Sequence, residues 1–378
     1  MTIKKNLKNH PTFRRKYEIC KRHYLKHNLR NAMSNSIFLE MKTKATVILA
    51  VMMTFIYSNI SAAVTPRALE EVIYDPEDSI RIEILLKQGI AQPKGTNLQI
   101  FFAQQFLGLP YVARTLEANY IQSPQTAYEQ LIINTRELDC TTFVETVSNL
   151  TITALQGKTT FADYCQNLIR MRYQKGIING YASRNHYYST AIDNMQRLGI
   201  AKELKPTDCP RVKARRYQHI NYMTTHTQQY PALAAPGGDK HLPAIRKAEE
   251  IISRQQTYIP LSELGKSQEE LSCIEDGDIL ALVTDKPGLD VAHVVIAQWG
   301  KDGMLHFIHA SSLRHKVVEE PLTLLQYQQQ QKQLGVRVVK LQIVESQISG
   351  KKHSHKSDAL ERIKNQQYSN PLPTQHPI

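Results

Sequence analysis

The sequence predicts an α+β domain, with helices in its first half and an antiparallel sheet in its second. Between residues 79 and 198 the apolar residues are spaced as on the buried faces of short helices. From Gly277 onward the pattern changes to short apolar runs that are typical of strands. Connections such as residues 299–303 are short enough for hairpins, so the strands should pair antiparallel.

The predicted helices of the first half carry start and stop signals. Thr96 and Asn97 precede the second helix, and Gly108 ends it. Residues 203–245 are polar and rich in His, Thr, Gln and Pro, which indicates a long loop or an insertion. The helices are expected at residues 79–88, 98–107, from 140 onward, at 161–173, over about ten residues ending near 198–199, and at 243–254.

The helix that begins near Cys140 is the most informative element. Asp139 is a favourable N-cap residue, and Val144 and Val147 begin a buried helical face. Cys140 should therefore lie at the helix N-terminus, where free N–H groups and the helix dipole lower the pKa of a cysteine. A nucleophilic thiol is one interpretation, and a small buried apolar side chain is the other.

Strands are expected at residues 277–283, 292–297, 305–310 and 336–341. His293 and His309 fall on neighbouring strands of a hairpin, in which residue 293 should pair with 309 or 310. The two imidazoles would then share one sheet face, and the Cys140 helix would pack on that face. Such a site supplies a thiol, a base and an orienting group. The alternative is that both histidines are ordinary residues of a half-buried sheet.

The net charge of +13 is concentrated at the N-terminus. Residues 1–44 hold 12 Lys or Arg and 2 Glu, so the rest of the chain is nearly balanced and nucleic-acid binding is not expected. Residues 41–63 have a basic start, an apolar run and the small residues Ser61-Ala62-Ala63, which predict a secretory signal peptide. Residues 1–40 are interpreted as a basic leader or an over-extended start, with an uncleaved anchor as the alternative.

An exported protein, periplasmic or extracellular, can form disulfides. If Cys140 is a working thiol, one pair at most can form among Cys165, Cys209 and Cys273. Residues 64–348 are expected to form a single domain, and residues 349–378 a polar disordered tail. No metal or cofactor is expected for catalysis, since no H-E-x-x-H or similar spacing occurs. The oligomeric state is left open.

These residues, in this order, support a family resemblance. Leu109-Pro110-Tyr111, Asp139-Cys140, Gly277-Asp278-Ile279, His293 and His309-Ala310-Ser311 together resemble the NlpC-type peptidoglycan hydrolases, which have a papain-like fold. The resemblance implies a nucleophile helix packed on an antiparallel sheet that carries the histidines. It also implies that Cys140 is the nucleophile, His293 the base, His309 the orienting group and Tyr111 a residue of the substrate pocket.

The chain departs from the usual pattern at Thr141, where the family has Ser, and in its large insertion. It resembles a divergent branch whose members are N-acetylmuramoyl-L-alanine amidases, with peptidoglycan or muropeptides, including 1,6-anhydro forms, as substrates. Asp139, Thr141, Arg184, His186 and Tyr187 are the further candidates for substrate contacts. Arg184 suits the carboxylates of a stem peptide. The alternative is that Arg184 and its neighbours only hold a loop in place.

Two other functions remain open. An endopeptidase that cuts between D-glutamate and diaminopimelate would use the same site on another bond. A cell-wall-binding protein without catalysis could have kept only the fold, although its intact Cys, His and His set argues against that.

Overall fold

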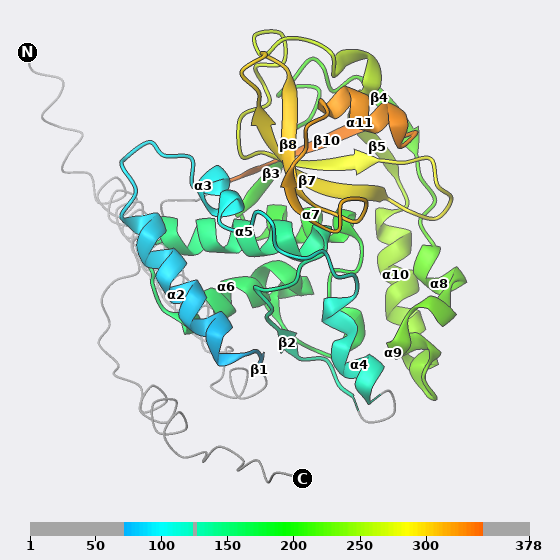
Figure 1. Ribbon diagram of the computed structural model, residues 1–378. Coiled ribbons are helices and arrows are strands. Elements are labelled where there is room, and N and C mark those ends of the chain that lie inside the picture. The colour runs from blue at the N-terminus through cyan, green and yellow to red at the C-terminus, as the bar shows by residue number, and fades with distance from the viewer. Residues whose placement is uncertain (1–71, 124–126, 343–378) are drawn as a thin grey trace, which may run out of the picture. The chain divides into compact units, whose positions relative to one another are not determined.

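The computed structural model describes residues 72–123 and 127–342, all of which belong to the compact unit Pro66–Ile378 (Figure 1). The predicted leader 1–40, signal peptide 41–63 and tail 349–378 lie outside the described residues. None of the helices in the described ranges has the length and apolar character that a membrane crossing needs.

The predicted helices are present, with boundaries set by their caps. The first, α2, is longer than expected because Asp75 and Asp78 form a capping box around Pro76. The second, α3, starts at its predicted cap Asn97 but ends earlier. The main helices are α2 (Pro76–Ile90), α3 (Leu98–Gln104), α5 (Cys140–Leu155), α6 (Phe161–Arg172), α7 (Tyr188–Arg197), α10 (Leu242–Ile252) and α11 (Leu324–Gln330).

Shorter helical turns connect these elements. The short α-helices are α4 (Ala118–Gln122), α8 (Tyr222–Thr225) and α9 (Pro231–Ala234). The 3₁₀ turns are η2 (Thr115–Glu117), η3 (Gln174–Gly176), η4 (Tyr181–Ser183), η5 (Thr227–Gln229), η6 (Gly238–His241) and η7 (Leu261–Glu263).

The main sheet has eight strands in the order β4-β5-β10-β6-β7-β8-β9, with β3 also paired to β10. All of its pairings are antiparallel, as the short connections predict. A separate pair, β1 (Val72–Ile73) and β2 (Leu131–Ile132), is parallel. The main strands are β3 (Ala201–Glu203), β4 (Ala214–Tyr217), β5 (Gln255–Pro260), β6 (Ile279–Val283), β7 (Val291–Trp299), β8 (Leu305–Ser311), β9 (Lys316–Glu319) and β10 (Gly335–Leu341).

Four of these strands were not predicted. Strand β4 lies inside the supposed loop 203–245, so that part is an insertion with its own strand rather than a loop alone. It was missed because Ala214–Tyr217 is largely polar and partly exposed, as befits the end of a sheet. Strands β3 and β9 have only three and four residues, and β5 is mostly polar, so none of the three has a long apolar run and all were missed.

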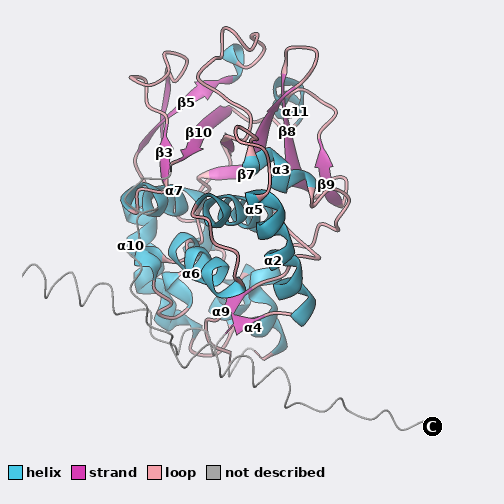
Figure 2. Ribbon diagram, turned by 90° about the vertical axis from the view of Figure 1, so that its left-hand side faces the viewer, coloured by secondary structure: helices cyan, strands magenta, loops and turns pink. Residues whose placement is uncertain are grey.

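The sheet separates two apolar clusters. Helix α5 lies against one face, with Val144 and Val147 packed near Val294 and Ile296. Figure 2 shows most helices in a layer on this side of the sheet. The other face is covered by α11 and the β5–β6 connection, which enclose a smaller cluster including Leu282, Val295, Phe307 and Tyr327. A third cluster holds α4, η4 and α8–α10 together.

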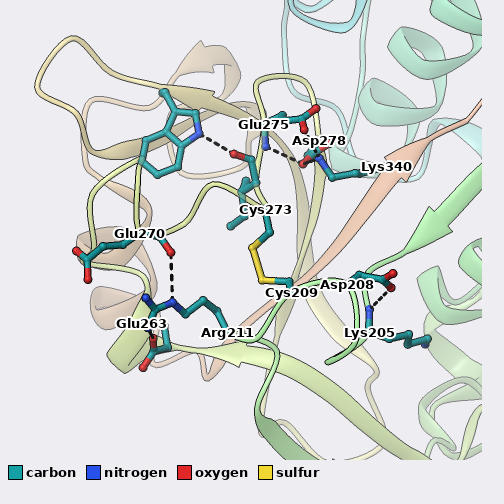
Figure 3. Close-up of a disulfide and its surroundings, with 12 residues drawn as sticks. Lys205, Asp208, Cys209, Arg211, Glu263, Glu270, Cys273, Glu275, Asp278 and Lys340 are labelled. Atoms are coloured by element: carbon teal, nitrogen blue, oxygen red, sulfur yellow. Dashed lines mark hydrogen bonds and ion pairs between the residues drawn. A yellow bond between two sulfur atoms is a disulfide. The ribbon is translucent and has the colours of Figure 1, made fainter.

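One disulfide joins Cys209 in the insertion to Cys273 before β6, over a separation of 64 residues (Figure 3). Arg211, two residues from Cys209, donates to Glu263 at 3.0 Å and so fastens the same segment. Cys140 and Cys165 are the free cysteines of the described residues. The single pair expected from the sequence is therefore Cys209–Cys273, and Cys165 is the one left over.

Candidate active site

Cys140 is the first residue of α5, as the sequence predicts. The Asp139 carboxylate accepts hydrogen bonds from the Thr142 N–H at 2.8 Å and from the Thr142 hydroxyl at 2.9 Å. In return, the Asp139 N–H donates to the Thr142 hydroxyl oxygen at 2.9 Å. This capping box holds Cys140 where the first backbone N–H groups of a helix have no intrahelical acceptor.

His293 on β7 and His309 on β8 are in direct contact. Nε2 of His293 is 2.7 Å from Nδ1 of His309. The predicted register of the hairpin is nevertheless wrong, because Ile296 pairs with Ile308, which sets residue 295 rather than 293 opposite His309. The two histidines are thus diagonal neighbours on one face, a distance that their rings can bridge.

On the N-terminal side of Ile296 and the C-terminal side of Ile308, strands β7 and β8 no longer pair, although both continue. Val294 packs toward α5, whereas His309 lies against Tyr327 of α11, with 5.6 Å between ring centroids. The expectation that α5 packs on the histidine face is therefore wrong. Neighbouring residues of a strand point to opposite faces, and Val294 rather than His293 points to the helix.

The thiol shares neighbours with the imidazoles. The backbone of Val294, next to His293, lies close enough to the Cys140 sulfur to favour its thiolate form. Tyr327, which stacks on His293, is close enough to Cys140 for a negative charge there to raise the pKa of Tyr327. Within the described residues, the side-chain contact of Sγ is with the Thr141 hydroxyl at 4.0 Å and not with an imidazole. The thiol therefore lies by the residue that follows His293 in β7, but it is not hydrogen bonded to either imidazole.

The expected lowering of the cysteine pKa is corrected by the structure. Burial raises the pKa of the Cys140 thiol to about 12, and the adjacent Asp139 carboxylate contributes to the rise. The Thr141 hydroxyl and the backbones of Val294 and Thr141 favour the thiolate, but they do not offset desolvation. Cys140 is therefore a protonated thiol at neutral pH.

The pKa values of both imidazoles are lowered, which keeps the two rings neutral. Burial lowers the pKa of His293 to about 3, and the neighbouring His309 adds to this. The pKa of His309 is lowered to about 3 by burial and by the Arg314 guanidinium. Each ring thus has one N–H and one lone pair at neutral pH.

A carboxylate that was not predicted from the sequence extends the histidine pair. Oε2 of Glu320 lies 3.3 Å from Nε2 of His309, and Glu320 is buried. Arg314 donates from Nε to Oε2 at 3.1 Å and from Nη2 to Oε1 at 2.9 Å. No motif marks Glu320, but strand β9 pairs Val318 with His309, so predicting that strand would have placed Glu320 near the site.

Three tyrosines surround the thiol. Burial raises the pKa of Tyr111, Tyr188 and Tyr327, and a negative charge on Cys140 would raise each further. Tyr111 was predicted here, and its N–H donates to the backbone oxygen of His315 at 3.0 Å. The other two were missed, because Tyr188 and Tyr327 belong to helices far along the chain from Cys140.

Arg184 is buried away from this cluster. Its guanidinium forms an ion pair with Glu117, lies 3.6 Å from Glu129 and donates to the Leu116 carbonyl at 2.7 Å. With two carboxylates and a carbonyl already bound, Arg184 is not free to hold a stem-peptide carboxylate. Its observed contacts fit the alternative interpretation, in which it holds loops together.

His186 and Tyr187 also have partners within the protein. Nε2 of His186 is 2.8 Å from the Tyr181 carbonyl oxygen, and burial lowers the pKa of His186 well below its usual value. The Tyr187 hydroxyl donates to Glu249 at 2.7 Å and accepts from the Met223 N–H at 2.8 Å. The bonds of Tyr187 attach α8 and α10 to the segment before α7, and the bond of His186 lies within that segment. None of them connects either residue to Cys140.

Over residues 72–123 and 127–342, no group of three or more His, Cys, Asp or Glu side chains is arranged to hold a metal ion. The two histidines of the cluster contact each other, and His309 also contacts Glu320. The cluster thus gathers a thiol, two imidazoles and a carboxylate, which are groups used in proton-transfer and nucleophilic chemistry.

Comparison with protein families matches residues 101–336 to the AmiA-like family, described as N-acetylmuramoyl-L-alanine amidase-like. The matched range contains the whole cluster, from Tyr111 to Tyr327. None of the curated proteins matches the chain.

Among solved structures, the chain is similar to an N-acetylmuramoyl-L-alanine amidase from Bacteroides uniformis. The identity is 33% and the TM-score 0.57, over 68% of this chain and 100% of that one. A structure from Bacteroides fragilis, named for a proposed xylanase activity, has 35% identity and a TM-score of 0.57 over 64% and 99% of the two chains. A protein from Legionella pneumophila shares the fold at 19% identity, with a TM-score of 0.53 over 71% and 95%.

Proposed function

The chain belongs to the AmiA-like family of N-acetylmuramoyl-L-alanine amidase-like proteins, and on that premise we propose that it is a cysteine-dependent amidase. Its substrate is peptidoglycan or a muropeptide, and the bond cut joins the lactyl group of N-acetylmuramic acid to L-Ala. The proposal is supported above all by one arrangement. A thiol at a capped helix N-terminus lies by the backbone of Val294, next to His293 in β7, and Nε2 of His293 is 2.7 Å from Nδ1 of His309.

The proposed reaction uses the Cys140 thiol as nucleophile and the His293 imidazole as acid and base. The thiol gives its proton to His293 as sulfur attacks the lactyl carbonyl, and the proton then passes to the departing L-Ala nitrogen as the C–N bond breaks. Water next attacks the thioester, with His293 as base, and restores the thiol. His309 orients His293 throughout.

The carbonyl oxygen gains negative charge during both attacks. The N–H groups of Cys140 and Thr141 begin α5 and come before the first intrahelical acceptor, so they are suitable donors for an oxyanion. Tyr111, Asp139 and Thr141 adjoin the thiol and line the proposed substrate pocket. The cysteine helix, the paired histidines and the antiparallel sheet together fit a papain-like, NlpC-type arrangement.

The resting pair is a neutral thiol and a neutral imidazole. Desolvation causes both shifts, raising the pKa of Cys140 and lowering that of His293. We propose that proton transfer occurs as the substrate carbonyl arrives, when the developing oxyanion and the imidazolium stabilise each other. A reactive thiolate is then absent until a substrate is bound.

Export is part of the proposal. A structural disulfide persists in oxidising compartments, and the chain pairs Cys209 with Cys273. The pairing supports a periplasmic or extracellular protein, in agreement with the basic and apolar pattern of residues 41–63. Peptidoglycan lies in the same compartment.

Two other activities are weaker candidates. Endopeptidase cleavage of the stem peptide would use the same thiol and base, and only the products distinguish it. Glycoside hydrolysis, suggested by the name of the Bacteroides fragilis structure, needs two carboxyl groups facing the sugar bond. Here Asp139 caps α5 and Glu320 is bound to Arg314 and His309, so neither is free for that role.

The test is digestion of defined muropeptides, with and without 1,6-anhydro ends, followed by mass spectrometry. Cys140→Ala should abolish cleavage, because it removes the nucleophile, while leaving the thermal unfolding temperature nearly unchanged. Cys165→Ala is the matched control, since Cys165 is the other free cysteine of residues 72–123 and 127–342 and lies buried in α6. It should keep its activity.

The products decide among the candidates. Free muramyl sugar with an intact stem peptide indicates an amidase, whereas cleavage within the peptide indicates the endopeptidase. Full activity in Cys140→Ala would rule the thiol mechanism out. Failure of the wild-type protein to cut any of these muropeptides would favour the binding protein.

A further inference from the structure

The chain of hydrogen bonds behind Cys140 ends at the ion pair of Glu320 and Arg314. We propose that Glu320 is a positioning residue that sets the tautomers of His309 and His293, so that Nδ1 of His293 is the proton acceptor for Cys140. The proposal rests on the proposed function only where it names His293 as the base. The tautomers themselves follow from the contacts.

The first step concerns the carboxylate. Arg314 donates to both oxygens of Glu320, at 2.9 and 3.1 Å, and the Leu322 N–H donates to Oε1 at 3.3 Å. An arginine is always charged, so the group that it binds in this two-point geometry is an ionised carboxylate. An ionised carboxylate only accepts hydrogen bonds. The contact at 3.3 Å therefore requires that Nε2 of His309 carries the proton.

The second step concerns His309. Its side chain is fully buried, and a neutral imidazole has a single N–H. With that N–H at Nε2, its Nδ1 has a lone pair and can only accept. The atom 2.7 Å away, Nε2 of His293, must then be the donor.

The third step concerns His293. Its one N–H is at Nε2, so its Nδ1 has the free lone pair. When Nδ1 takes the proton of Cys140, the hydrogen bonds from His293 to His309 and from His309 to Glu320 remain as they were. His309 lies between Glu320 and His293, so the negative charge of Glu320 also stabilises the imidazolium that forms on His293. No hydrogen bond behind the base has to be rebuilt during the reaction.

Glu320→Gln tests this directly. A glutamine has one oxygen and one NH₂, so with its oxygen toward Arg314 its NH₂ faces His309 and donates to Nε2. Both tautomers then reverse, and Nδ1 of His293 carries a proton that blocks its use as base. We expect kcat to fall by about 100-fold to 10⁴-fold, as for other wrong-tautomer variants, with little change in KM.

Two further variants separate tautomer control from stability. Glu320→Asp keeps an acceptor-only carboxylate and should recover much of the activity. Glu263→Gln is the matched control, since Glu263 is likewise a buried glutamate with a basic partner, Arg211 at 3.0 Å, but lies beside the disulfide (Figure 3). It should reduce stability and leave kcat unchanged.

The tautomers can be read without any substrate. In the full chain labelled with ¹⁵N-histidine, NMR should show Nε2–H for both His293 and His309, assigned with His293→Gln and His309→Gln. Glu320→Gln should convert both to Nδ1–H. Nδ1–H on His309 in the wild type, or unchanged tautomers in Glu320→Gln, would overturn the proposal. A protein with the expected tautomers but no amidase activity would refute the proposed function alone.

Discussion

At the scale of single residues, burial decides the charge state of the site. Desolvation raises the pKa of Cys140 to about 12 and lowers that of His293 to about 3, so both groups are neutral at rest. The helix N-terminus, which led the sequence analysis to expect a thiolate, is a weaker influence than desolvation and Asp139. Asp139 therefore has two effects, since it positions the thiol by capping α5 and opposes its ionisation.

Replacing Asp139 by Asn separates these effects. Asparagine is as good an N-cap as aspartate, so Thr142 keeps its acceptor and α5 its start. Loss of the negative charge should lower the pKa of Cys140 below its present value of about 12. The rate of alkylation by iodoacetamide, measured against pH, should rise several-fold near pH 9. An equal or slower rate would show that Asp139 does not oppose the thiolate.

The buried histidines predict how stability depends on pH. The pKa of His186, His293 and His309 is lowered in the folded protein, so between about pH 6.5 and these lower values the unfolded chain binds more protons. The stability is complete above about pH 6.5 and falls as the pH drops below it. Each histidine contributes a slope of up to about 1.4 kcal/mol per pH unit.

His186→Phe tests one of these contributions away from the active site. The phenyl ring can keep the contact with Tyr181 but cannot be protonated. Urea denaturation at several pH values between 4.5 and 7.5 should show a shallower loss of stability than in the wild type. The same slope in both proteins would mean that His186 is protonated in the folded state.

At the scale of elements, local sequence signals determine where the helices begin, and turns determine where the strands begin. Capping boxes begin α2, α5 and α11. Gly277 introduces β6 with a φ of +84°, a conformation that disfavours side chains, and an added Cβ there would lie 2.7 Å from Oδ1 of Asn97. The Gly-Asp motif is thus a structural turn that lets the N-cap of α3 approach the start of β6.

Gly277→Ala should therefore be more harmful than an alanine at an open turn. Gly303 has a φ of +73° but no atom within 4 Å of an added Cβ, so Gly303→Ala should cost only the backbone strain of about 1–2 kcal/mol. Gly277→Ala should cost more, because Asn97 and Gln99 must also move. Urea denaturation of both variants gives the comparison, and equal losses would contradict it.

At the scale of the whole molecule, the insertion is attached to the rest of the fold near its start and near its end. The disulfide joins Cys209 to Cys273 beside the sheet, while Tyr187 and Glu249 join α10 to the segment before α7. The pieces between them are short and have few long apolar runs. Long-range links therefore add to the small third apolar cluster, which also packs α8–α10 against α4 and η4.

Cys209→Ser with Cys273→Ser should lower the free energy of unfolding by about 4 kcal/mol. This value follows from the loop entropy for a separation of 64 residues. Amidase activity at room temperature should remain, because neither cysteine adjoins Cys140. The wild type in reducing agent should unfold like the double variant, and Cys165→Ala, which keeps the disulfide, should lose stability in reducing agent as the wild type does. A stability independent of reducing agent would contradict the prediction.

The sequence by itself determined what depends on neighbours along the chain. The start of α5 at Cys140, the order of the helices and the antiparallel strands were all readable, because caps, turns and apolar spacing are local. The family resemblance picked out Tyr111, His293 and His309 from motifs of the same local kind. Arg184 was predicted as a substrate contact because its partners, Glu117 and Glu129, lie more than fifty residues away in the sequence and no local pattern indicates them.

Only the tertiary structure decided the charge states of those residues and which side chains lie around them. Desolvation depends on everything packed around a group, so the high pKa of Cys140 could not come from its own helix. Glu320 and Tyr327 reach the histidines because β9 and α11 fold back over β8, without any motif of their own. The choice of Cys209 and Cys273 over Cys165 had the same cause, since which sulfurs meet depends on the packing of distant segments.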